Sequence, residues 1–156
     1  MLTILQTGKK EESYMPDVIK LLETDHREVE DLFAKAESTS GAAKQQVVTK
    51  IASELTLHAE VEEQIVYPAM REAGLNEIVD EAEQEHSKVK QLIAQLQAMD
   101  ATTDEVDAVL DELKADVQHH VEEEESEGFP KFREAVDQAE LQALATRVQE
   151  AKQAAS

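Results

Sequence analysis

Histidine and glutamate recur in this chain at spacings that could hold metal ions. Each of two copies of one pattern has a histidine, a second histidine 32 or 34 residues later, and a glutamate four residues after that. Imidazole and carboxylate are ligands that first-row transition metals take, and helical bundles present them from facing helices. The pattern therefore predicts a metal site. Its candidate ligands are His26, His58 and Glu62 from the first copy and His86, His120 and Glu124 from the second.

These six residues continue the apolar faces of the helices that the sequence predicts. Apolar residues recur at helical spacing in four stretches, about 16–37, 47–69, 75–96 and 106–124. A lone histidine on such a face is more often a satisfied core residue, but here each stretch carries one at a repeated position. A carboxylate in a core costs several kcal/mol unless it is paired or bound to metal. A bundle without metal would have to tolerate two of them.

The spacing of the loops predicts the fold class. Residues 38–41, Gly74 and residues 100–103 separate the four stretches, and Pro68 should kink or end the second helix. Thr102 and Glu105 match a capping box, and Asp137 should cap a last helix over about 138–152. We therefore expect an all-α protein, an up-down-up-down four-helix bundle with a short extra C-terminal helix. Residues 1–13 should form a flexible extension, and residues 14–156 one domain.

Composition excludes several kinds of site. The net charge of −20 disfavours nucleic acid and anionic membrane surfaces as partners. The chain has no cysteine, which rules out disulfides, thiolate metal sites and cysteine-bound iron–sulfur clusters and fits a reducing cytosol. No apolar run reaches the length of a transmembrane helix, and the N-terminus lacks the order of a signal peptide. We expect a cytoplasmic protein, and its oligomeric state stays open.

The number of ligands indicates two metal ions. Six protein ligands exceed what one tetrahedral zinc uses, and carboxylates such as Glu62 and Glu124 can bridge two ions. Each ion would then have about two histidines and two carboxylate oxygens, with positions left for an oxo or hydroxo bridge and an external ligand. Mixed imidazole and carboxylate ligation with open positions favours iron, and manganese or zinc would also fit.

The duplicated motif resembles the hemerythrin-like, HHE cation-binding domain over about residues 16–135. Each copy has a second glutamate directly after the first and a proline five residues further on, at Glu63 and Pro68 and at Glu125 and Pro130. The resemblance implies a non-haem di-iron centre inside the bundle. By position, the four histidines would be terminal ligands and the two glutamates bridging ligands. These are His26, His58, His86 and His120, with Glu62 and Glu124.

The resemblance also implies a reaction with a small oxidant, namely dioxygen, peroxide or nitric oxide. Whether this means binding or turnover, such as catalase-like removal of peroxide, stays open. The alternative is an iron- or metal-responsive sensing or storage module without turnover. Oxygen-carrying hemerythrins use a fifth histidine, one helical turn from the one at position 86. This chain has Ala82 and Lys90 at those places, which disfavours oxygen carriage, and Glu83 is a candidate substitute.

The positions of four further residues predict their roles. His119 falls off the apolar stripe and should be a surface residue among acids. Glu63 and Glu125 belong to a solvated acidic face, or else support the ligands from behind. Tyr67 precedes Pro68 and should serve packing.

Overall fold

The computed structural model describes residues 16–155, which form helices joined by short loops and contain no strand. The prediction of an all-α fold is therefore confirmed, while the extension predicted at residues 1–13 lies outside the described residues. The elements are α2 (Val18–Glu37), α3 (Gly41–Val61), η1 (Glu62–Val66), α4 (Tyr67–Glu72), α5 (Asn76–Ala98), α6 (Glu105–Glu123), η2 (Glu124–Gly128), α7 (Phe129–Ala135) and α8 (Gln138–Ala155).

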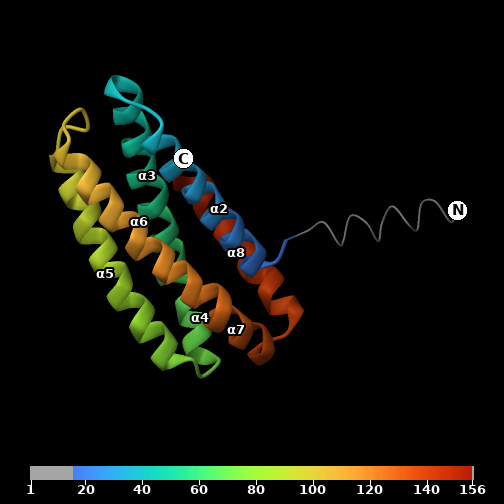
Figure 1. Ribbon diagram of the computed structural model, residues 1–156. Coiled ribbons are helices and arrows are strands. Elements are labelled where there is room, and N and C mark those ends of the chain that lie inside the picture. Colours follow the sequence, from blue (N-terminus) through green and yellow to red (C-terminus); the bar gives the residue numbers. More distant parts are fainter. Residues whose placement is uncertain (1–15, 156) are drawn as a thin grey trace, which may run out of the picture.

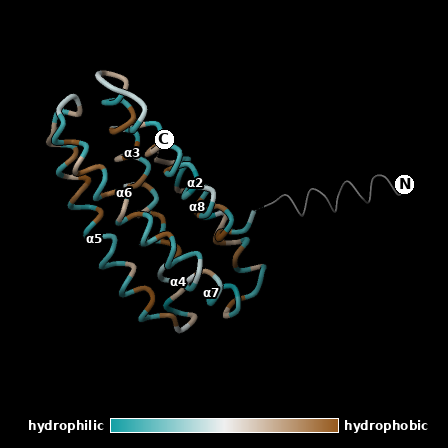
Figure 2. The backbone as a smooth tube through the Cα atoms, viewed as in Figure 1, coloured by the Kyte–Doolittle hydropathy of each residue, from teal (hydrophilic) through white to brown (hydrophobic). Residues whose placement is uncertain are grey.

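Four long helices lie side by side and surround the core (Figure 1). Helix α2 packs against α3, α5 packs against α6, and α3 and α2 contact α5 and α6 respectively. Helix α8 lies against α2 and α3. Hydrophobic positions alternate with hydrophilic ones along each helix (Figure 2), as a packed amphipathic helix requires. Within residues 16–155, no helix is both long enough and apolar enough to cross a membrane.

The apolar core consists of two clusters, one toward each end of the bundle. One cluster includes Val29, Leu55, Val89 and Val117, and the other includes Leu22 and Val61 with residues of α4, α7 and α8. Along each long helix, the candidate ligands lie between the residues of these two clusters. The clusters therefore exclude water from both ends of the site.

Each proline of the duplicated motif follows a π-helical turn. Helices α3 and α6 continue directly into η1 and η2, and Pro68 and Pro130 lie in the first turns of α4 and α7. Proline lacks a donor N–H and its ring clashes with the carbonyl of an ordinary helical turn, whereas a widened turn accommodates it. At Pro68, where the sequence predicts a kink or an end of the helix, the structure has a widened π turn before the proline. Both π turns begin at a candidate ligand, Glu62 or Glu124.

The helix caps agree only in part with the sequence predictions. Asp137 accepts a hydrogen bond from the backbone N–H of Glu140 at 2.9 Å, so the predicted cap is confirmed. The predicted capping box is wrong, because α6 starts after Asp104 and has no side-chain cap there. The backbone N–H and hydroxyl of Thr102 instead donate to Asp100, which closes a local turn.

Asp17 caps α2 and also joins it to the C-terminal part of the chain. Its carboxylate accepts from the Lys20 backbone N–H at 3.0 Å, from Arg133 at 2.8 Å and from Gln138 at 3.0 Å. Burial tends to raise the pKa of Asp17, but the bonds from Arg133 and the backbone lower it overall. The ionised carboxylate therefore stabilises the folded state.

We expect Asp17→Ala to lower the free energy of unfolding by about 1–2 kcal/mol, because it removes the cap and leaves Arg133 without its acceptor. Thr24→Ala, on the exposed face of α2, is the control and should change it by less than about 0.5 kcal/mol. Urea unfolding of both variants checks this. Equal stability losses would show that Asp17 does not connect these elements energetically.

Candidate metal centre

The six candidate ligands meet in the interior of the bundle, one histidine from each long helix. All are buried, and Glu62 has no exposed surface. Their donor atoms form two groups, in each of which the atoms lie within 4.8 Å of one another. The two groups share Glu62. One group consists of His26, His58, Glu62 and Glu124, and the other consists of Glu62, His86 and His120.

Each glutamate faces histidines of both copies. The Oε1 atom of Glu62 lies 3.1 Å from His58 Nε2 and 3.2 Å from His86 Nε2. Glu124 instead uses a different oxygen for each histidine, with Oε1 3.3 Å from His26 Nε2 and Oε2 3.3 Å from His120 Nε2. Each carboxylate therefore lies between a histidine of one copy and a histidine of the other.

Several of these buried atoms have no hydrogen-bond partner among the described residues. They are Nε2 of His26 and His58, both oxygens of Glu62 and Oε1 of Glu124. A buried polar atom without a partner costs about 1–3 kcal/mol, and more when it is charged. Five of them converging on one point would destabilise the core, whereas a cation there would satisfy them. The donor set therefore fits metal ions.

Four carboxylates orient the four histidines from behind. Each Nδ1 atom donates to one acid, which leaves Nε2 of the neutral ring as the basic nitrogen facing the centre. The contacts join adjacent helices in a closed ring. They are His26 to Glu125 at 2.7 Å, His58 to Asp25 at 3.1 Å, His86 to Glu63 at 2.8 Å and His120 to Glu85 at 2.8 Å.

The sequence analysis anticipated only two of these four acids. Glu63 and Glu125 had two interpretations, and the structure supports the one in which they stand behind the ligands. Asp25 and Glu85 were missed. Each directly precedes a histidine of its own helix but orients the histidine of the neighbouring helix. The sequence signal was an acid at the same place in both copies.

Tyr67 packs in the core, as predicted, and its hydroxyl also enters the site, which the sequence did not indicate. Its hydroxyl donates to Glu124 Oε2 at 2.7 Å and lies 3.2 Å from His86 Nε2 and 3.4 Å from His120 Nε2. In the other copy the equivalent residue is Phe129, whose ring stacks on His26 at a centroid distance of 6.0 Å. The two halves of the centre therefore differ by one hydroxyl group.

The vacant fifth-histidine position is not filled by Glu83. Its carboxylate pairs with Arg71 and is 47% exposed, so that suggestion was wrong. Ala82 is buried, and Lys90 donates to Glu63 at 2.8 Å. The hydroxyl of Tyr67 is the additional polar group that reaches the histidine of α5.

His119 is a surface residue, as predicted, with a side chain that is 64% exposed. It lies among acids, as predicted, and one of them belongs to the neighbouring helix α5. Its Nε2 lies 3.2 Å from Glu85 Oε2 on α5 and 3.1 Å from Glu123 Oε1.

Protons compensate the buried carboxylates when no metal is bound. Burial lowers the pKa of His58, but Glu62 and Asp25 outweigh it and raise this pKa to about 10. Burial raises the pKa of Glu62, and contacts with the histidines lower it well below its usual value. Burial and Glu124 raise the pKa of Tyr67, so its hydroxyl is neutral. A metal ion binding at neutral pH must therefore displace protons from the histidines.

A small apolar cavity of about 30 Å³ adjoins the histidines. Its apolar lining is formed by Val29, Leu55, Val89, Val117 and Val121. A cavity of this size admits a molecule as small as dioxygen or nitric oxide and excludes organic substrates.

The family model of the hemerythrin HHE cation-binding domain matches residues 17–132. The chain belongs to this family. A crystal structure of a Mycobacterium kansasii protein that contains a hemerythrin HHE cation-binding domain shares the fold, with a TM-score of 0.78, 22% identity and 90% coverage of each chain. The resemblance inferred from the duplicated motif is therefore confirmed.

Two relatives are longer than this chain. A protein of Nostoc described as a DNA nickase is 30% identical over 96% of this chain and 42% of its own length. An uncharacterized hemerythrin-like protein of Schizosaccharomyces pombe is 30% identical over 64% of this chain and 50% of its own length. The chain thus spans half or less of the length of these relatives.

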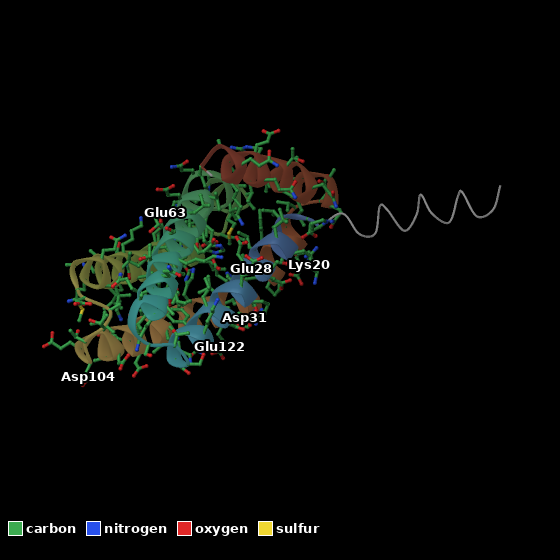
Figure 3. All side chains as sticks on the ribbon, turned by 90° about the horizontal axis from the view of Figure 1, so that it is seen from above. Lys20, Glu28, Asp31, Glu63, Asp104 and Glu122 are labelled. Atoms are coloured by element: carbon green, nitrogen blue, oxygen red, sulfur yellow. The ribbon has the colours of Figure 1, made fainter. Side chains whose placement is uncertain are left out.

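We expect Asp25→Ala to weaken metal affinity about 10- to 100-fold, because His58 loses the acceptor that fixes its orientation. Glu28→Ala is the control, since Glu28 lies on the exposed face of α2 (Figure 3). Competition with a chelator of known affinity measures both. An affinity of Asp25→Ala equal to that of the control would show that this acid does not support the site.

Proposed function

We propose that this chain is a hemerythrin-like protein with a non-haem di-iron centre that binds or reacts with a small oxidant. The proposed ligands are His26, His58, His86 and His120, bridged by Glu62 and Glu124. The observation that carries the proposal is the pair of donor groups that share Glu62 and leave its two oxygens without hydrogen bonds. Iron suits this mixture of imidazole and carboxylate, and manganese or zinc could replace it.

Two reduced irons would supply two electrons to dioxygen or peroxide. The surrounding residues set the conditions for that chemistry. The valine-lined cavity admits a diatomic molecule next to the histidines, and its apolar walls exclude water. Tyr67 places a neutral hydroxyl, a hydrogen-bond donor to Glu124, beside His86 and His120. We therefore favour reaction with dioxygen, peroxide or nitric oxide, including catalase-like conversion of peroxide to dioxygen and water.

The alternative is a metal-responsive sensing or storage module without turnover. The ring of contacts between acids and histidines favours it, because metal occupancy would then stabilise the packing of all four long helices. We further propose that residues 14–156 form one domain, an up-down-up-down bundle with α8 as the additional helix. A cytoplasmic location remains a prediction from composition.

The activity named for the Nostoc relative is not our proposal for this chain. That protein extends well beyond the matched region, which is 42% of its length. A net charge of −20 opposes contact with phosphate backbones, so we favour a small-molecule partner over DNA.

We expect protein produced with iron to hold about two metal ions per chain. His120→Ala should bind fewer ions and unfold at a lower temperature, because it removes a ligand and metal binding is coupled to folding. His119→Ala, the neighbouring exposed histidine, should keep the wild-type metal content. Elemental analysis and thermal unfolding measure both. A wild-type ratio of one or zero, or equal metal loss in both variants, would contradict the assignment.

We expect the reduced di-iron protein to oxidise in air without a long-lived oxygen adduct. The reason is that α5 supplies one histidine, so the irons have more open positions than in a five-histidine carrier. Stopped-flow spectroscopy of the anaerobically reduced protein mixed with dioxygen checks this. Tyr67→Phe should change the rate, because it removes the hydroxyl beside His86. An adduct that releases intact dioxygen under vacuum would assign the chain to the carriers instead.

A further inference from the structure

The two copies of the motif differ in what covers them. The last helix, α8, packs on α2 and α3 of the first copy. Its Leu141, Leu144, Ala145 and Val148 belong to the same apolar cluster as four residues of the first copy. These four are Leu21, Leu57, Val61 and Ile65.

The corresponding face of the second copy is polar, and no helix of residues 16–155 covers it as α8 covers the first. Equivalent residues are 60 positions apart on α2 and α5, as His26 and His86 are, and 62 apart on α3 and α6, as His58 and His120 are. The residues equivalent to those four apolar positions are Glu81, His119, Glu123 and Glu127. A face that is sealed in one half of the molecule is therefore acidic in the other.

Glu85, the acid on this face that orients His120, has different partners from the other three acids behind the histidines. Three of the four acids are paired with a lysine or arginine: Asp25 with Lys152, Glu63 with Lys90 and Glu125 with Arg27. Among the ion pairs of residues 16–155, Glu85 has no such partner. Its outer oxygen instead faces His119, which also faces Glu123.

A cavity connects this face with the buried centre. It measures about 20 Å³, room for roughly one water molecule. Glu81, Glu85, Glu123 and Glu127 are among its lining residues, and so are two candidate ligands, His120 and Glu124. Glu124 is 6% exposed, and its Oε1 accepts no hydrogen bond. The cavity thus lies between the exposed carboxylates of this face and two of the candidate ligands of the buried centre.

We propose that Glu85, His119 and Glu123 form a surface site for a divalent cation, through which metal ions reach and leave the buried centre. One donor atom from each of the three residues lies within 4.8 Å of the others, a spacing that one ion can span. The acids around the cavity attract cations, and Glu85 touches both the outer site and His120. The inference rests on the proposed function, since it requires a buried metal centre to be filled.

The test is the rate of metal uptake by the metal-free full-length chain. Anaerobic stopped-flow absorbance follows binding of Co²⁺ to the wild type and to the double variant His119→Ala/Glu123→Gln. We expect uptake to slow at least about fivefold, since the variant removes the imidazole donor and replaces one carboxylate donor with a neutral, weaker one. Release of Co²⁺ to excess chelator should slow as well, and the final number of tightly bound ions should stay the same.

Glu122→Gln is the matched control, because Glu122 lies on the same helix, is exposed and loses the same single charge (Figure 3). It should take up Co²⁺ at the wild-type rate. An unchanged rate in the double variant, or equal slowing in the control, would overturn the access route. A reduced final metal content in the double variant would also overturn it, since the residues would then support the buried centre itself.

A titration of the loaded protein provides an independent measurement. Mn²⁺ added after the tight sites are filled should give one additional weak site by electron paramagnetic resonance, absent from the double variant. A weak site that persists in the variant would contradict the assignment of these residues. If the wild type took up no tightly bound metal at all, the proposed function itself would fail, and this outcome is distinct from a change in rate.

Discussion

Two carboxylates buried in an aliphatic core are the constraint on which this structure depends. Glu62 has no exposed surface and Glu124 is 6% exposed, and neither has a lysine or arginine beside it in residues 16–155. Their charge can be balanced only by protons on the histidines or by metal cations. Protonated histidines leave several donors and acceptors without partners, whereas metal ions would use all of them. The packing of four helices therefore depends on what occupies their centre.

The four carboxylates behind the histidines extend this dependence to the interfaces between the helices. Asp25 joins α2 to α3, Glu85 joins α5 to α6, Glu63 joins η1 to α5, and Glu125 joins η2 to α2. Each contact fixes a ring that must point at the centre. Because every long helix takes part, removing one acid affects the orientation of a ligand on a neighbouring helix. Affinity for metal and packing of the bundle are thus two consequences of the same contacts.

The sequence was sufficient for the helices and for the candidate ligands because both follow the 3.6-residue period. A histidine on an apolar stripe is visible without coordinates, and its repetition makes it informative. Asp25 and Glu85 lie beside the stripe and contact a different helix, which no pattern within one helix reveals. The contact of the Tyr67 hydroxyl with the site was missed for another reason. The backbone N–H of Tyr67 donates to the Glu62 carbonyl across a π turn, which an α-helical period cannot place.

The departures from symmetry determine what the centre can do. The two copies agree at the ligands and at the acids behind them. They differ where Phe129 replaces Tyr67 and where α8 packs on α2, α3 and η1 of the first copy. An exact duplicate would give both metal positions the same surroundings and the same access. Here one half has a stacked ring under a sealed face, and the other has a hydroxyl under an acidic face. The half that holds His86 and His120 is therefore the one with both a hydrogen-bonding hydroxyl, from Tyr67, and a polar path to solvent, so exchange of ions and protons with water should be faster on that side.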